Sequence, residues 1–177
     1  GAGGVLVGGL IVQSPVDGVP LKAICADGTA GGTGVSTKGT YSFTVTCAST
    51  NYPFVISIDE VALAKLATAP NMAGPDLQFG TADDEPYTTT GQTPLKVAVE
   101  SPTAAANVVN MNAITTMAAQ TIENKINDVV NKVVGATPPV PGDVQTAETK
   151  LQVAFGVTSV KNSNPVTDSQ VARINSQ

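Results

Sequence analysis

The chain has 177 residues and a formal net charge of −5, with 9 basic and 14 acidic side chains and neither His nor Trp. The absence of His excludes Ser-His-Asp and Cys-His catalysis and imidazole metal ligands, and the absence of a basic cluster argues against nucleic-acid binding. Only 13% of the residues are charged, well below the ~25% usual for a soluble domain, whereas 42% are hydrophobic. The composition predicts a non-catalytic, β-rich protein with a real core and a weakly charged surface.

The first predicted element is an uncharged strand over residues 5–12. Its apolar side chains are Val5, Leu6, Val7, Leu10, Ile11 and Val12, and consecutive apolar positions are typical of a strand covered on both faces. Exposed, this Pro-free segment would promote aggregation. It is therefore expected to form the first strand of its own sheet or to complete a neighbouring copy's sheet by strand addition. No apolar run is long enough for a membrane-spanning helix, and any secretory signal is expected to have been removed before Gly1.

Further strands are predicted at short, regular intervals. Residues 21–26 form one, and a flexible Gly-Thr patch over 31–34 separates it from the next. Residues 41–47 alternate between apolar and polar side chains, which is the pattern of a half-buried strand. Residues 54–58 and 95–99 are also predicted strands. Strands at this spacing, divided by Gly, Pro and Asp turns, indicate a β-sandwich.

The two cysteines, Cys25 and Cys47, lie 22 positions apart in predicted strands. Two interpretations are open, a pair of free buried thiols or a disulfide, and the disulfide fits a small, Thr-rich, exported chain better. A metal pair is rejected, because without His the remaining ligands would have to be carboxylates.

The C-terminal part is predicted to be helical, after a short helix within 60–70 and a turn-rich segment over 70–94. Apolar side chains recur every three or four residues from Asn112 to Val134, with Asn112 as N-cap and Gly135 at the end. The members of this apolar stripe are Ile114, Met117, Ala118, Ile122, Ile126, Val129 and Val133. A second helix is predicted from a cap at Asp143 to Gly156, and a third near residues 167–170. The stripes could form a cofactor groove, but packing on the sandwich is favoured.

Three early segments carry a family resemblance. They are Asp17-Gly18-Val19-Pro20-Leu21-Lys22-Ala23, Thr37-Lys38-Gly39-Thr40-Tyr41-Ser42-Phe43 and Pro53-Phe54-Val55-Ile56. They resemble the carboxypeptidase regulatory-like domain, in which a DG-x-PL-x-GA-x-V segment precedes a T-x-x-x-G-x-Y-x-F strand. Residues 106–118 are similar to the VNVTPLTTLAA strand-to-helix segment that often follows this domain in exported bacterial surface proteins and lipoproteins. Here Ala113 stands where the family has Pro, and Lys22-Ala23 replaces the usual Gly-Ala pair.

This resemblance implies a transthyretin-like β-sandwich that serves as a structural and binding module without catalytic residues. It also implies a strand over 106–111 and a helix that begins near Asn112. The competing prediction is a helix from Ser101-Pro102, because Ser is a good N-cap and Pro suits the first helical position.

The acidic segment 74–85 is a candidate calcium site. Its carboxylates are Asp76, Asp83, Asp84 and Glu85, and Ca²⁺ prefers six to eight oxygen ligands on a sharply turning loop, which Gly80 would allow. The segment resembles the GPDG-x-x-GTADD loops of bacterial surface proteins, which are taken to bind calcium, but it does not follow EF-hand spacing. The alternative is a solvated acidic loop.

Together these observations favour a mostly β protein with C-terminal helices (α+β), built as a transthyretin- or Ig-like β-sandwich with two or three helices packed on it. The expected division is an N-terminal strand (1–13), a sandwich (14–111) and a helical segment (112–177). The expected function is a non-catalytic, secreted or cell-surface structural subunit that self-assembles head to tail, through its N-terminal strand, into filaments. The alternative is a monomeric cell-surface or lipoprotein binding module for glycans, with calcium shaping the acidic loop.

Overall fold

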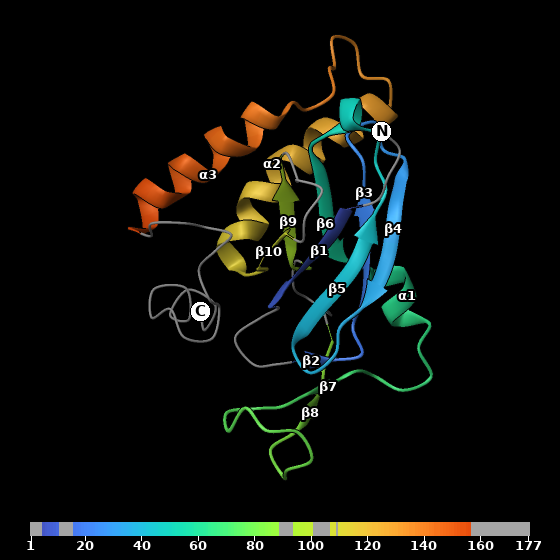
Figure 1. Ribbon diagram of the computed structural model, residues 1–177, viewed down its shortest axis with the longest axis vertical. Helices are drawn as coiled ribbons and strands as arrows, with labels where there is room; N and C mark the ends of the chain where they lie inside the picture. The colour runs from blue at the N-terminus through green and yellow to red at the C-terminus, as the bar shows by residue number, and fades with distance from the viewer. Residues whose placement is uncertain (1–4, 11–15, 89–93, 101–106, 109, 157–177) are drawn as a thin grey trace.

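The computed structural model describes residues 5–10, 16–88, 94–100, 107–108 and 110–156. Within them, two main sheets and a helical layer are stacked on one another (Figure 1). The larger sheet has the order β4-β3-β6-β9, with antiparallel neighbours. These strands are β4 (Ala30–Val35), β3 (Pro20–Ile24), β6 (Phe54–Ile58) and β9 (Lys96–Val99). The two long helices come after all the described strands in the chain, and this separation of strands and helices confirms the α+β prediction.

The second main sheet has the order β10-β1-β5. Its strands are β10 (Asn107–Val108), β1 (Val5–Leu10) and β5 (Thr40–Val45). A small ribbon, ordered β2-β7-β8, extends beside the sheets and holds the turn-rich segment. It contains β2 (Val16–Asp17), β7 (Asn71–Met72) and β8 (Glu85–Pro86), while the 3-10 turn η1 (Ser49–Asn51) and the short helix α1 (Glu60–Ala64) flank β6.

The main core lies between the two sheets. Strand β5 alternates as predicted, because Tyr41, Phe43 and Val45 are buried while the residues between them are exposed. They pack in one apolar cluster with Leu21 of β3 and Ile56 of β6. Strands β6 and β9 are buried along their whole length, since one face meets this core and the other lies under the helices.

Helix α2 (Ala113–Val130) begins at the predicted N-cap. The Asn112 Oδ1 atom accepts hydrogen bonds from the backbone N–H groups of Ile114 (2.8 Å) and Thr115 (2.9 Å). In return, the Asn112 N–H donates to Thr115 Oγ1 at 2.9 Å, so the pair closes a reciprocal capping box. The strand at 107–108 rules out a helix continuous from Ser101, and the predicted helix start near Asn112 is confirmed. Among the described residues, the strand expected over 106–111 covers only Asn107–Val108.

Helix α2 covers the outer face of the larger sheet. Its buried stripe consists of Ile114, Ala118, Ala119, Ile122 and Ile126, and the last three of these pack with Val55 and Ala98. The Thr115 hydroxyl donates to the carbonyl of Lys96 at 2.8 Å, and the N–H of Lys96 donates to Thr116 Oγ1 at 3.0 Å. The Lys96 ammonium forms an ion pair with Glu123 of α2. The apolar stripe is therefore a packing surface.

Two predicted helix boundaries were wrong. Helix α2 ends at Val130 with Asn131 as its C-cap, short of Gly135. Val133 and Val134 are 50% and 100% exposed, so burial of these side chains does not stabilise a longer helix. Helix α3 (Pro141–Phe155) starts before Asp143, because Pro suits the first helical position. Asp143 instead accepts a hydrogen bond from the N–H of Val140 at 2.9 Å.

The C-terminal cap of α3 at Gly156 is confirmed, with a left-handed φ of +68°. Helix α3 lies along α2 (Figure 1) and buries Val144 against it. The helix predicted near 167–170 lies outside the described residues.

Candidate assembly site

The N-terminal strand β1 is the middle strand of its sheet. All six of its residues pair antiparallel with β5, in a register that runs from Val5 opposite Val45 to Leu10 opposite Thr40. On its other side β1 pairs parallel with β10, with Val7 opposite Asn107 and Gly8 opposite Val108. Among the described residues, β1 alone connects β5 to β10.

The structure thus places four of the predicted assembly residues, Val5, Leu6, Val7 and Leu10, in a sheet of the same chain. This is the first of the two positions expected from sequence. Ile11 and Val12 lie outside the described residues.

Strand β5 is held at its beginning by contacts that do not involve β1. Thr37 and Thr40 form an isolated bridge that turns the chain from β4 into β5. The backbone N–H of Gly39 donates to the carbonyl of Val16 at 2.9 Å. The N–H of Lys38, a non-glycine residue with φ of +48°, donates to Asp17 Oδ1 at 2.8 Å. Asp17 thus stabilises a turn that few side chains favour.

The end of β5 is held by a disulfide between Cys25 and Cys47, which confirms the predicted pairing. Cys25 follows β3 of the larger sheet and Cys47 follows β5 of the second, so the bond links the two sheets. Both residues are buried, and their Cα atoms are 5.7 Å apart, within the usual range for a disulfide. Next to it, the Thr46 N–H donates to the carbonyl of Gly31 at 2.8 Å. Such bonds persist in oxidising environments.

The Gly-Thr patch at 31–34 forms most of strand β4. The prediction that this patch is flexible was therefore wrong. Its glycines are needed for close packing. A Cβ at Gly34 would lie 2.6 Å from the Phe43 ring, and one at Gly31 would lie 3.0 Å from the Cys47 sulfur. Sequence reasoning missed these two positions. The only available signal was glycine inside a strand pattern, which marks a close approach of another chain segment.

The acidic loop carries its carboxylates close together but gives them partners within the chain. Asp83 accepts from the Thr81 hydroxyl at 2.7 Å and from the N–H of Asp76 at 3.2 Å. Asp84 accepts from the Asn71 amide at 3.0 Å and from the N–H of Gly80 at 2.7 Å. These bonds tie the loop to β7.

The remaining two carboxylates of the loop belong to Asp76 and Glu85. Asp76 accepts from the N–H of Gln78 at 2.9 Å, and Glu85 is exposed in β8. In the part of the chain that the structure describes, no group of three or more acidic or cysteine side chains is arranged to hold a metal ion.

Hydrogen bonds lower the pKa of three carboxyl groups in turns. The Thr81 hydroxyl makes the largest contribution at Asp83, and the Asn71 amide does so at Asp84. The pKa of Asp27, in the turn after β3, is lowered mainly by the Thr29 hydroxyl. In each case the partner stabilises the charged form of the carboxyl, so these side chains shape turns while they remain ionised.

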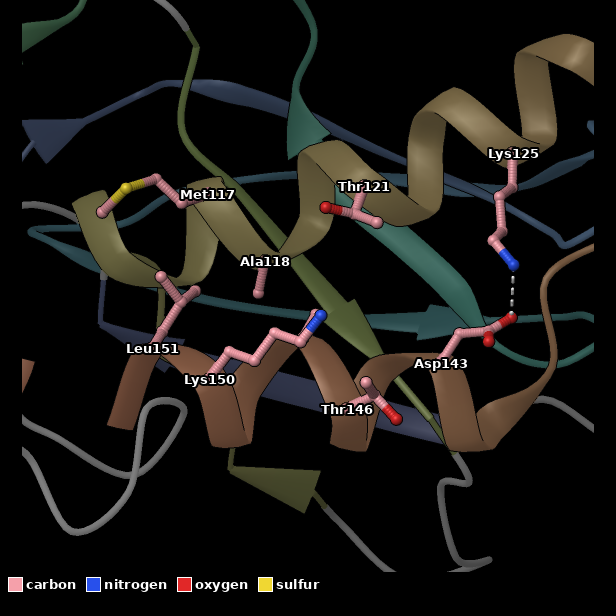
Figure 2. Close-up of a pocket in the computed structure, with 9 residues that line it drawn as sticks. Met117, Ala118, Thr121, Lys125, Asp143, Thr146, Lys150 and Leu151 are labelled. Carbon is pink, nitrogen blue, oxygen red and sulfur yellow. Dashed lines mark hydrogen bonds and ion pairs between the residues drawn. The ribbon is translucent and has the colours of Figure 1, made fainter. Parts of the chain in front are cut away.

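Helices α2 and α3 border an open groove of about 340 Å³ (Figure 2). Met117 and Leu151 lie at one end, and an ion pair between Lys125 and Asp143 (3.3 Å) closes the other. The Lys150 side chain reaches into the space between the helices. Met117, predicted to be part of the core stripe, is 41% exposed here. Val133 of that stripe is also exposed and Val129 is only half-buried. The groove offers apolar contact and a positive charge.

A comparison of the chain with protein-family models, with curated proteins and with solved structures finds no match. Among the described residues, no helix is both long and apolar enough to cross a membrane.

Proposed function

We propose that this chain is a non-catalytic, extracellular structural subunit that assembles head to tail into filaments by adding its N-terminal segment to the sheet of the next copy. The observation that carries this proposal is the position of β1. It is an uncharged strand, and it is the middle strand of its sheet. If β1 leaves its sheet, the gap between β5 and β10 can be filled by an identical strand from another copy.

A head-to-tail exchange does not close on itself, so it produces filaments rather than a fixed oligomer. The low share of charged residues, 13%, suits a subunit whose surface is largely covered by its neighbours. The disulfide supports an extracellular location, because such bonds form outside reducing compartments.

The proposal includes the finer fold suggested by the sequence, a transthyretin-like sandwich related to the carboxypeptidase regulatory-like domain. Two features support it. The aromatic residues of the motif, Tyr41 and Phe43, pack in the core between the sheets. The Asp17-Gly18 pair forms a turn between β2 and β3, with Gly18 at a φ of +88°.

Weak calcium binding by the acidic loop stays a prediction. Asp83 and Asp84 would have to exchange hydrogen bonds to Thr81 and Asn71 for the ion. Calorimetry with millimolar calcium should then show binding heat, and a chelator should lower the melting temperature. No heat together with an unchanged melting temperature would contradict this part of the proposal.

The assembly proposal is tested by deleting residues 1–12. The truncated chain should sediment as a soluble monomer, and a synthetic peptide of residues 1–12 added in excess should bind it and raise its melting temperature. Deletion of residues 1–4, which precede β1, is the matched control and should leave filaments in electron micrographs. Filaments that persist without residues 1–12 would refute the mechanism. A full-length chain that remains a monomer at all concentrations would favour a monomeric surface binding module instead.

A further inference from the structure

The proposed strand addition needs an acceptor, and the structure offers one in strand β5. Two conditions must hold when β1 is absent. Strand β5 must stay in place, and the edge that pairs with β1 must be open to another strand. The contacts at its two ends and along its buried face bear on the first condition, and its pairing with β1 bears on the second.

Strand β5 is held at both ends by contacts that do not involve β1. The turn at Thr37 and Thr40, together with the bond from Gly39 to Val16, holds its beginning. The Cys25–Cys47 disulfide and the bond from Thr46 to Gly31 hold its end. These contacts all lie within one copy and survive the departure of β1.

The buried face of β5 provides a third attachment. Tyr41, Phe43 and Val45 lie in the core between the sheets, with Phe43 packed closely over Gly34 of β4. Burial raises the pKa of the Tyr41 hydroxyl above its ordinary range, so this side chain stays neutral at all physiological pH values. Three apolar anchors and two fixed ends make β5 a preformed acceptor, which lowers the ordering cost of strand addition.

The edge of β5 that pairs with β1 is complementary to residues 5–10, because the two strands pair over six residues without a register shift. We infer that the acceptor in the assembled protein is the β5 edge, Thr40–Val45, of one copy. It is occupied by residues 5–10 of the adjacent copy, in the register Val5 to Val45 and Leu10 to Thr40. This inference rests on the proposed function. It adds the partner surface, the register and a role for the disulfide, which keeps the acceptor strand in place while it is empty.

The register is tested by cysteine crosslinking between two differently tagged copies of the full chain. One copy carries Gly8→Cys and the other Ser42→Cys, at positions that lie directly opposite in the register. Ser42 is exposed, and opposite Cβ atoms in an antiparallel pair lie about 5 Å apart, which allows a disulfide after small adjustments. After mixing and mild oxidation, we expect a crosslinked heterodimer in denaturing, non-reducing gels.

Two further pairs keep this test independent of any one variant. Leu6→Cys with Thr44→Cys is a second in-register pair and should also crosslink. Gly8→Cys with Thr40→Cys is the matched control, since Thr40 lies opposite Leu10 instead. Such diagonal neighbours are separated by about 7–8 Å, so this pair should give little heterodimer. The native cysteines are buried in their disulfide and should not exchange under mild oxidation.

The outcomes separate the inference from the proposed function. Filaments with in-register crosslinks support both. If filaments form while neither in-register pair crosslinks, the inference that β5 is the acceptor is wrong and the subunits assemble through another surface. A mixture that gives neither filaments nor heterodimer, while Gly8→Cys/Ser42→Cys in a single copy crosslinks internally, would overturn the proposed function as well.

Discussion

Opening the Cys25–Cys47 disulfide should destabilise the folded chain by about 3 kcal/mol. The bond closes a loop across a sequence separation of 22. A crosslink of this span removes about 11 cal/mol/K of entropy from the unfolded chain, which corresponds to about 3 kcal/mol at room temperature. The unfolded fraction should therefore rise roughly a hundredfold when the bond is removed.

Denaturant unfolding of the oxidised wild type, the reduced wild type and Cys25→Ala/Cys47→Ala measures this loss. The free energy of unfolding, rather than the midpoint alone, must be compared, because an uncrosslinked unfolded chain is more expanded and changes the denaturant slope. The alanine variant also loses two buried sulfur atoms, so it should be at least as destabilised as the reduced protein. Reducing agent should leave the alanine variant unchanged. A reduced wild type with the same free energy of unfolding as the oxidised form would show that the disulfide does not stabilise the fold.

Three more outcomes are expected at other positions. Gly34→Val should cost about 1–3 kcal/mol in thermal or denaturant unfolding, because its side chain would overlap the aromatic ring 2.6 Å away; Gly142→Ala, with no atom within 4 Å of the new Cβ, is the control and should be neutral or slightly stabilising. Asn112→Ala should lower the free energy of unfolding by about 0.5–2 kcal/mol through loss of the helix cap, and no loss would show that the capping box contributes nothing. The pKa of Asp83 is lowered in the fold, so the stability it adds is present above its unfolded pKa of about 3.9 and is lost as the pH falls through the folded value. Thr81→Val should raise that folded pKa toward its ordinary value in an NMR titration, and an unchanged value would contradict the assigned cause.

Local patterns were enough to predict the elements whose burial follows a simple period. The alternation of residues 41–47 gave β5 and its buried face correctly, because one side of that strand meets the core and the other meets solvent. The start of α2 was also predictable, since Asn112 and the side chains that follow it carry a local capping signal. The disulfide followed from composition and spacing.

Long-range packing decided what local patterns could not show. The glycines of β4 indicate flexibility on their own, and only the Phe43 ring and the disulfide above them explain why a strand needs them. The parallel pairing of β1 with β10 joins segments about a hundred residues apart and leaves no local trace. The four carboxylates lie in one short acidic segment of the sequence, but the hydrogen bond that joins Asp84 to Asn71 comes from a separate strand and leaves no local signal.

An electron cryo-microscopy reconstruction of filaments assembled from this chain would show whether strand addition joins the subunits, provided its resolution allows the backbone to be traced between them. We predict that residues 5–10 of each subunit lie between β5 and β10 of the adjacent subunit, antiparallel to β5, with Val5 opposite Val45. A reconstruction in which residues 5–10 stay in their own sheet and the subunits meet through another surface, such as the groove between α2 and α3, would contradict it.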